Sequence, residues 1–562
     1  MLRGSFDGAG GVLSGEGKGV VSCKAGTAVV FFSGVLFNQK ELAQGAENEA
    51  EIVARLYRQR GIDGFAELNG PFVLALFDGA QLVLARDHLG QAFLFFRADG
   101  GKVFFSESLN DVPHGPDRDW QAFADYLSLG YVPAPRTIWR DVEKLTAGSA
   151  ALFRNGVRSV RRYWSPVYAP SRRLSFEDAA QETRRLARQA IRRCLALDDQ
   201  AGFLLSGGID SSLLLSLTAE EFSAPRRAFT VGFADPRYDE RALAQTVARN
   251  AGVEHVTRQV EPSGFAALLQ AQKLSGEPFA DSSLLPDCCA MKLAAGRCST
   301  VLLGDGGDEF FGGYRRYRIM ALRSRLGEGL SRFGGGAASL LAKMLPRASE
   351  GRTSLSTLGR LGKALRLPPV PCYASFQELF SPDELTALAP DLFARTERYG
   401  AIGSYHAEWR KIFEESPGVN GVNRIDLLYY LPDDGCRKEG LAAEYAGIRA
   451  FSPLLDMDVV RFALTLPVDY RLNLRQGKLL LRRIGREYLP DAILHQVKRG
   501  FGMPVAAWLR NELKSHLLAL PDKLDACGCF DKPYLRRLVQ EHLDGKADHG
   551  AKLWALICCA EA

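Results

Sequence analysis

The sequence predicts two folded parts: an antiparallel β-sandwich followed by a doubly wound parallel α/β sheet that carries helical additions. Three observations support this fold class. Short apolar runs bounded by Gly, Asp or Asn dominate the N-terminal region. Later, buried strands alternate with helices through glycine turns. Between the two patterns, the proline-bearing stretch Ser165–Phe176 breaks the periodicity. We therefore expect one domain over residues 1–165 and a second over 172–562.

The N-terminal part is predicted to be a pair of packed antiparallel sheets with a helix on one face. Its predicted helix is Glu49–Arg60. Its predicted strands are rich in Val, Phe and Leu, and they lie in Ala28–Phe37, Gly70–Gly79, Gln81–Asp87, Ala92–Asp99 and Lys102–Ser108.

The second part reads as successive strand–turn–helix units, which build a parallel sheet. The predicted helices include Glu177–Ala196, Ser211–Glu221 and Arg241–Asn250, and the predicted strands are Ala201–Leu205, Ala228–Phe233 and the start of Thr300–Tyr314. In such a sheet the ligand binds at the carboxyl ends of the strands, and both glycine turns fall there.

Composition excludes several classes of protein. The net charge of +6 over 562 residues is too small to indicate a nucleic-acid binder. No apolar run approaches the ~20 residues that span a membrane, and the start lacks the apolar core of a signal peptide. The 11 cysteines and 8 histidines are scattered, which argues against disulfides and zinc. We expect a cytoplasmic protein with small-molecule or peptide substrates, no membrane contact and no nucleic acid.

A basic insertion is expected at about 315–368. It holds an excess of Arg and Lys over Glu328 and Glu350 and a Gly-rich centre. Its two aromatic residues, Tyr317 and Phe333, are too few to alternate with the charges as a nucleic-acid surface would require. A solvated helical insertion is therefore favoured over an arm that contacts a polyanion.

The first glycine turn, Ser206–Ser212, follows a buried strand and opens a helix. Backbone N–H groups of such a turn and the helix N-terminus together bind anions. Asp210 would be a poor neighbour for a phosphate unless a divalent cation lay between them. The turn lacks the lysine of the GxxxxGK[ST] phosphate loop, so it is a different motif.

The second glycine turn, Gly304–Gly313, contains three carboxylates: Asp305, Asp308 and Glu309. Carboxylates this close repel one another unless a cation or a basic substrate joins them. A tight βα turn is the alternative interpretation of the first motif, and an ordinary acidic loop is that of the second. The presence of both motifs in one chain favours a nucleotide site.

SGGIDSS resembles the pyrophosphate-binding motif of N-type ATP pyrophosphatases, and LLGDGGDEFFGGY resembles the asparagine synthetase family, which includes the β-lactam synthetases. The resemblance extends to the stretches Leu127–Ser149, Gly276–Pro286 and Val497–Pro504. It implies an N-terminal glutaminase-like (Ntn-hydrolase-like) sandwich and a C-terminal synthetase domain of the adenine nucleotide α-hydrolase type. It also implies ATP and Mg²⁺ as cofactors.

The resemblance assigns roles to individual residues. Asp210 and Asp308 would hold Mg²⁺, Asp305 would be the general base beside the acyl-adenylate, and Lys498 would stabilise the negative charge that develops during the reaction. The residues that would contact the nucleotide are Leu205, Ser206, Gly207, Gly208, Asp210, Ser211, Ser212, Val231 and Gly304.

Two departures from the family pattern matter. Glutamine-hydrolysing members begin Met-Cys-Gly, whereas this sequence begins Met1-Leu2-Arg3, and leucine has no nucleophile. Its counterpart of the family's Asn-Gly-Glu loop comes early, at Ser33–Asn38, which indicates shortened preceding strands. In addition, most of the usual side chains between Asp434 and Pro453 are replaced, and Arg449 stands where the family has glutamate. We interpret these changes as lost glutamine hydrolysis and an altered substrate pocket.

The sequence therefore predicts an AMP-forming ligase of specialised metabolism that adenylates a carboxylate and couples it to an amine without hydrolysing glutamine. An intramolecular β-lactam or peptide cyclase, an ammonia-dependent asparagine synthetase and a non-catalytic binding subunit are the alternatives. A homodimer is possible because the family often forms dimers. The acid, the amine and any ring closure are left open.

Overall fold

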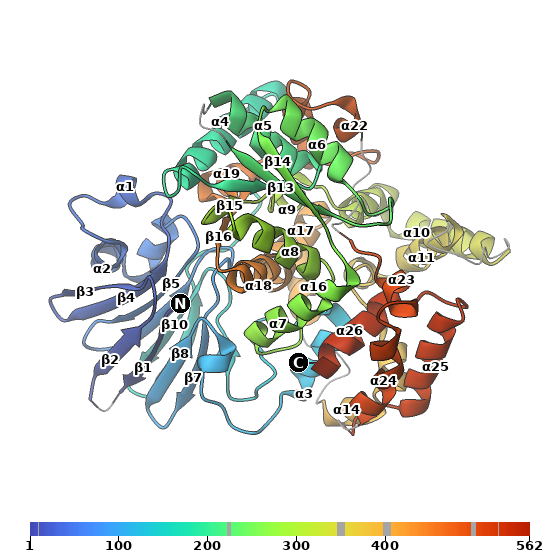
Figure 1. Cartoon of the computed structure of the whole chain (residues 1–562). Helices are drawn as coiled ribbons and strands as arrows, with labels where there is room; N and C mark the ends of the chain where they lie inside the picture. The colour runs from blue at the N-terminus through green and yellow to red at the C-terminus, as the bar shows by residue number, and fades with distance from the viewer. Residues whose placement is uncertain are drawn as a thin grey trace.

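The computed structural model describes the whole chain except residues 9, 222–225, 345–353, 397–405, 496–501, 526–527 and 562. Two antiparallel sheets form the N-terminal part, and a parallel sheet flanked by helices forms the remainder (Figure 1). The predicted change from antiparallel to parallel architecture is confirmed. Within the described residues, no helix combines the length and apolar character needed to cross a membrane.

The two N-terminal sheets pack face to face. The five-stranded sheet has the order β2 (Val12–Glu16), β1 (Arg3–Asp7), β8 (Lys102–Ser106), β7 (Phe95–Asp99) and β9 (Glu143–Lys144). The six-stranded sheet has the order β11 (Val157–Arg162), β10 (Ser149–Arg154), β6 (Leu82–Arg86), β5 (Phe72–Phe77), β4 (Ala28–Gly34) and β3 (Val21–Ala25). Phe6, Val73 and Phe105 belong to the apolar layer between them. Alternate residues of β4 and β5 pack instead against Ile52 and Leu56 of α2 (Glu49–Arg60), as period-2 strands require.

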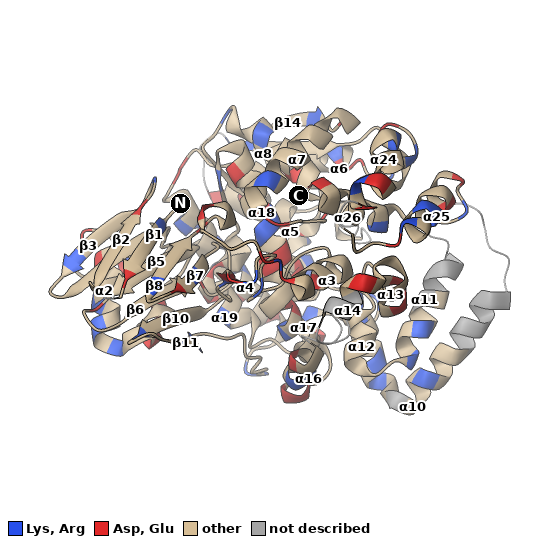
Figure 2. Cartoon of the chain, turned by 90° about the horizontal axis from the view of Figure 1, so that it is seen from below, with Lys and Arg blue, Asp and Glu red and all other residues tan. Residues whose placement is uncertain are grey.

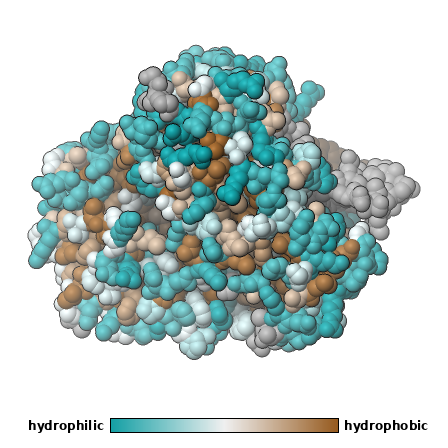
Figure 3. Space-filling view, in the orientation of Figure 1, coloured by the Kyte–Doolittle hydropathy of each residue, from teal (hydrophilic) through white to brown (hydrophobic). Residues whose placement is uncertain are grey.

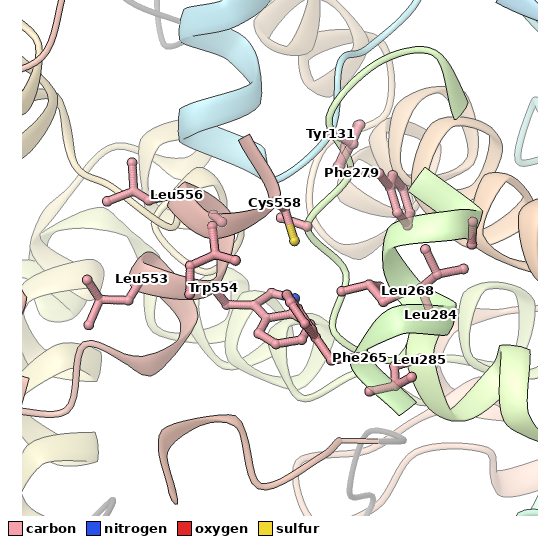
Figure 4. Packing of buried hydrophobic residues seen from close by; sticks show 14 of the residues in the cluster. Tyr131, Phe265, Leu268, Phe279, Leu284, Leu285, Leu553, Trp554, Leu556 and Cys558 are labelled. Carbon is pink, nitrogen blue, oxygen red and sulfur yellow. The ribbon is translucent and has the colours of Figure 1, made fainter. Parts of the chain in front are cut away.

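The parallel sheet has the order β14 (Glu254–Gln259), β13 (Arg227–Gly232), β12 (Gly202–Leu204), β15 (Thr300–Leu302) and β16 (Arg449–Phe451). Helices that cover one face include α4 (Phe176–Leu195), α5 (Ile209–Glu221) and α21 (Leu479–Gly485). Those on the other include α7 (Phe265–Ser275), α8 (Leu284–Ala295), α18 (Cys436–Ala446) and α26 (Gly550–Glu561). Figure 4 shows how Trp554 of α26 packs beside Phe265 of α7 in this second layer.

The strand register brings the two glycine turns together. β12 pairs in parallel with β15, and Phe203 lies opposite Leu302. Each strand is followed directly by its glycine turn, so both turns emerge side by side at the same edge of the sheet.

The two parts of the chain are in direct contact. Helix α3 (Trp120–Leu129) precedes the last sandwich strands, yet its Tyr126 and Leu127 are buried in the apolar layer of the parallel-sheet part. In the other direction, Asn69 accepts a hydrogen bond from the Met457 N–H and donates one to Asp456. The periodicity of the sequence could not predict that α3 packs against the parallel-sheet part, because that contact joins segments distant in the sequence.

The basic insertion is helical where it is described. Helices α10 (Arg315–Met344) and α11 (Ser354–Arg366) pack together and project from the body of the molecule (Figures 1 and 2). The rest of the surface in the view of Figure 3 is largely hydrophilic, with scattered hydrophobic residues.

Candidate active site

A cavity of about 500 Å³ lies at the carboxyl ends of β12, β13 and β15. Both glycine turns line it, as the position of the turns predicted. The predicted site residues on its wall are Leu205, Ser206, Gly208, Asp210, Ser211, Val231, Gly304, Asp305 and Asp308.

The first turn is arranged to present its backbone to a ligand. Gly207 adopts a φ of +71°, a conformation that glycine accepts without steric cost. The Gly208 N–H donates to the Ser206 hydroxyl, which also lies 3.2 Å from the Ser211 hydroxyl. Helix α5 begins immediately afterwards, so the positive end of its dipole lies at the cavity. This arrangement suits an anionic group.

Asp210 and Asp308, one from each turn, converge on a single lysine. The Lys478 Nζ lies 2.5 Å from Oδ2 of Asp210 and 2.7 Å from Oδ1 of Asp308. Burial opposes the charge on Lys478, but the two carboxylates outweigh it and raise the pKa of its ammonium. The site thus places two carboxylates about one cation position.

Glycine is required where these carboxylates sit. A Cβ on Gly307 would lie 2.3 Å from Cγ of Asp210, and one on Gly313 would lie 1.8 Å from Oδ1 of Asp308. Real Cβ atoms do not approach other atoms so closely. The space that the two carboxylates need therefore explains Gly307 and Gly313 of the GDGGDEFFGG string.

Further positively charged side chains line the cavity together with Lys478. Arg475 and Lys478 belong to one short segment, and Arg318 donates to the Arg475 carbonyl oxygen at 2.7 Å. Arg482 holds the same segment by donating to the Gly477 carbonyl. Several positive side chains next to an anion-binding turn favour a polyphosphate.

The second turn also contributes Asp305 and Glu309. The Ser452 hydroxyl donates to the backbone carbonyl of Asp305 at 2.7 Å and so fixes the turn. Burial is the main cause that raises the pKa of Glu309 to about 7, the charge of Asp308 adds to it, and the hydrogen bond from Tyr314 opposes it. A carboxyl group with a pKa near neutrality is able to exchange protons at physiological pH.

The opposite side of the cavity is acidic. Helix α8 supplies Asp287, α18 supplies Lys438 and Glu439, and the loop before α8 supplies Asp281. The Lys438 Nζ lies 3.5 Å from Asp287, 3.5 Å from Glu439 and 3.8 Å from Asp281. We call these four residues, together with Asp305, the acidic pocket.

The remaining predicted residues are placed as follows. Gly207 and Ser212 do not line the cavity, and Ser212 is fully buried, so their contact with a nucleotide stays a prediction. Lys498 lies outside the described residues, although His495 and Gly502 on either side of that segment reach the cavity wall.

The interpretation of Arg449 as a determinant of the substrate pocket is corrected by the structure. Arg449 is the first residue of β16, at the edge of the sheet opposite the cavity, and its half-exposed side chain lies 3.6 Å from Asp198. The charged residues of that segment that do line the cavity are Lys438 and Glu439. The sequence analysis did not single out these two residues, although they stand as an adjacent Lys-Glu pair in that segment. It also missed Lys478, which belongs to no local motif because only the fold brings it to the two turns.

The donor set suits Mg²⁺. Asp210 and Asp308 offer carboxylate oxygens around one position, and Mg²⁺ characteristically takes one or two carboxylates and completes its shell with substrate phosphates and water. Within the described ranges, no group of three or more His, Cys, Asp or Glu could hold a metal ion by itself. The residues therefore fit a magnesium ion that arrives with a phosphate ligand.

The structure thus places a cavity suited to an anionic ligand, at the carboxyl ends of a parallel α/β sheet, next to an antiparallel β-sandwich. The Asparagine synthase family matches residues 182–562, and the Glutamine amidotransferase domain matches residues 13–164. The chain belongs to the asparagine synthase family, which makes it an ATP-dependent amide ligase by class.

Relatives match along most of the chain. It is 25% identical to asparagine synthetase [glutamine-hydrolyzing] 1 of Bacillus subtilis, over 94% of this chain and 84% of the relative. It is 28% identical to a putative asparagine synthetase of Mycobacterium bovis, over 94% of this chain and 83% of the relative. A more partial match, 26% identical over 48% of this chain and 44% of the relative, is amidase chyE of Penicillium rubens.

Proposed function

We propose that this protein uses ATP to adenylate a substrate carboxylate, releases pyrophosphate and then couples the acyl group to an amine without hydrolysing glutamine. The observation that carries the proposal is the convergence of Asp210 and Asp308 from two glycine turns on one cation position, beside Asp305. We assign residues 172–562 to the synthetase domain and 1–165 to a glutaminase-like domain.

In the first half-reaction the chain binds and orients the triphosphate. The first glycine turn and the start of α5 hold phosphate oxygens, while Lys478, Arg318 and Arg475 neutralise the charge of the leaving pyrophosphate. Magnesium, when bound by Asp210 and Asp308, would supply Lewis-acid stabilisation of the phosphates. Lys478 leaves its present position between the carboxylates to contact the nucleotide.

In the second half-reaction an amine displaces AMP from the acyl-adenylate. The amine must lose a proton to attack, and Asp305 on the cavity wall is the proposed base. The ammonium passes one proton to the Asp305 carboxylate, and the free amine then attacks the acyl carbon. The C–N bond forms, the bond from the acyl carbon to the AMP oxygen breaks, AMP leaves as an anion, and the nitrogen loses its second proton to solvent to give the neutral amide. Lys498 keeps its role as electrostatic stabiliser as a prediction from the sequence.

Independence from glutamine is supported by the residue in front of β1. Leu2 is fully buried in the apolar layer that also contains Phe6 and Phe105. An aliphatic side chain at this position offers no nucleophile for glutamine.

The test is ATP–pyrophosphate exchange across a panel of carboxylic acids, followed by mass spectrometry of products formed with candidate amines. Exchange with one acid, abolished in Asp210→Asn, supports the proposal, and exchange with aspartate alone would favour asparagine synthesis. A product lighter than its acid by one water would identify a ring-closing enzyme. Absence of exchange with every acid would leave only a binding role and contradict the proposal.

A further inference from the structure

The acidic pocket carries more negative than positive charge. The ammonium of Lys438 lies among three carboxyl groups (Asp281, Asp287 and Glu439), and Asp305 adds its negative charge nearby. The distances of 3.5–3.8 Å from the ammonium to the three groups exceed the ~2.7–2.9 Å of a direct charged hydrogen bond. Among the described residues, this one ammonium therefore balances the three carboxyl groups only in part.

Two carboxylate oxygens in this pocket lack a short hydrogen bond. Asp287 is 7% exposed and lines the cavity, and its Oδ2 contacts the Lys438 ammonium only at 3.5 Å and has no hydrogen-bond donor among the described residues. Oε2 of Glu439 is likewise buried without a hydrogen-bond donor among the described residues. A buried carboxylate oxygen without a short hydrogen bond is costly, and a donor on a ligand would remove that cost.

The raised pKa values of Asp287 and Glu439 are consistent with an excess of carboxyl groups in the pocket. Burial is the main cause that raises the pKa of Asp287 to about 7; Asp305 and Asp281 add to the effect, and Lys438 opposes it. Burial also raises the pKa of Glu439, with further contributions from Asp287 and Asp305. An additional cation would let both groups ionise.

An organic cation fits better than a metal ion here. The carboxylates are spread around the cavity wall, and no three of them in the described chain are grouped as metal ligands. A primary ammonium group has three donors and can bridge separate acceptors such as Asp287 and Glu439.

We propose that the acceptor amine enters this pocket as a protonated primary amine, with its ammonium held by Asp287 and Glu439 next to Asp305. The inference rests on the proposed function and adds the charge state and the binding residues of the second substrate. Lys438 competes with the incoming ammonium for the same carboxylates and so sets the affinity of the pocket.

The experiment measures the thermal unfolding midpoint of the full chain against n-butylammonium chloride, with n-butanol as the neutral probe and NaCl to keep ionic strength constant. A ligand that binds the native state raises the midpoint with concentration. We expect a rise with n-butylammonium alone. Asp287→Asn and Glu439→Gln should each weaken binding about tenfold or more, because each removes one partner of a buried charge pair.

Two further variants separate recognition from general effects. Glu444→Gln makes the same change on the same helix, outside the cavity, and should leave the apparent Kd within about twofold. Lys438→Met removes the competing cation and should tighten binding several-fold, which is opposite in sign to the other pocket variants and is not expected from a structural defect.

The proposed function and this inference fail in different ways. Equal shifts from n-butylammonium and n-butanol, or unchanged affinity in Asp287→Asn and Glu439→Gln, would overturn the ammonium pocket even if pyrophosphate exchange is robust. A lack of exchange in the unaltered protein, with selective amine binding intact, would count against the ligase reaction alone.

Discussion

Lys478 balances the charge of the two carboxylates that we propose as magnesium ligands. It is buried, adopts a left-handed backbone conformation with a φ of +57°, and neutralises Asp210 and Asp308 at the centre of the cavity. Without a cation, two adjacent carboxylates would repel each other strongly at low dielectric. The lysine thus stabilises the two adjacent carboxylates and must yield its position when a divalent cation binds there.

Replacement of Lys478 by methionine should therefore have two effects of opposite sign. Affinity for Mg²⁺ alone should rise, because the competing ammonium is gone. Pyrophosphate exchange should fall about 100-fold, as expected when one preorganised charge is removed from a transition state. Calorimetric Mg²⁺ titration and exchange kinetics measure the two effects, and a parallel loss of both would show that Lys478 only maintains the fold.

His88 makes the sandwich sensitive to acid. Burial is the main cause that lowers its pKa to about 3; Nε2 lies 3.3 Å from the Ala66 carbonyl oxygen, and Nδ1 has no hydrogen-bond partner in the described chain. The unfolded chain binds this proton near pH 6.5, so the stability that the neutral ring contributes is lost as pH falls below that value.

His88→Gln should reduce this acid sensitivity while keeping a donor for Ala66. The unaltered protein should lose about 2 kcal/mol more than the variant between pH 6.5 and pH 5. Denaturant unfolding at the two pH values gives the difference directly. Because other titrating groups are common to both proteins, equal losses would show that His88 does not control the slope.

At the scale of elements, helices with local start signals were predictable. Helix α2 begins where predicted because the Asn48 side chain accepts a hydrogen bond from the Glu51 N–H. Strands β1 to β3 were not predicted individually, because they are partly exposed and carry mixed polar residues. The acidic pocket was unpredictable as a unit, since α8 and α18 are distant in sequence and meet only through the packing of the fold.

The short helix α9 (Gly307–Phe311) tests the steric argument for the second turn. Gly307→Ala should displace Asp210, reduce affinity for ATP by about tenfold or more and destabilise the protein by about 1–3 kcal/mol. Gly440→Ala on α18 meets nothing within 4 Å and should leave ATP affinity unchanged, with a small gain in stability. Nucleotide titration and thermal unfolding of both variants check this, and equal behaviour of the pair would refute the steric explanation.

At the scale of the whole molecule, the two parts of the chain are joined by buried polar contacts. Asp456 is 1% exposed, contacts Arg193 at 3.0 Å and accepts a hydrogen bond from Asn69 of the sandwich. A second junction places Arg86 of the sandwich 3.8 Å from Asp433, in a region where both side chains are buried. Contacts of this kind need both partners, since a charge left alone in the interior is costly.

A matched pair of substitutions measures the strength of this junction. Asp456→Asn keeps the side-chain shape and the capacity to cap α19 (Met457–Ala463), but it weakens the contact with Arg193. Arg193 retains Asp458 and Glu41 as partners, so we expect the free energy of unfolding to fall by about 2 kcal/mol. Asp469→Asn removes an exposed partner of Arg172 and should cost less than about 1 kcal/mol.

Limited proteolysis distinguishes a weakened junction from general destabilisation. If Asp456 holds the sandwich against the parallel-sheet part, its asparagine variant should be cleaved faster between β11 and α4, in the connecting residues 163–175, while each part persists as a resistant fragment. Cleavage spread evenly over the chain, or equal rates in the Asp456 and Asp469 variants, would mean that the two parts are held together mainly by their apolar contacts, such as those of α3.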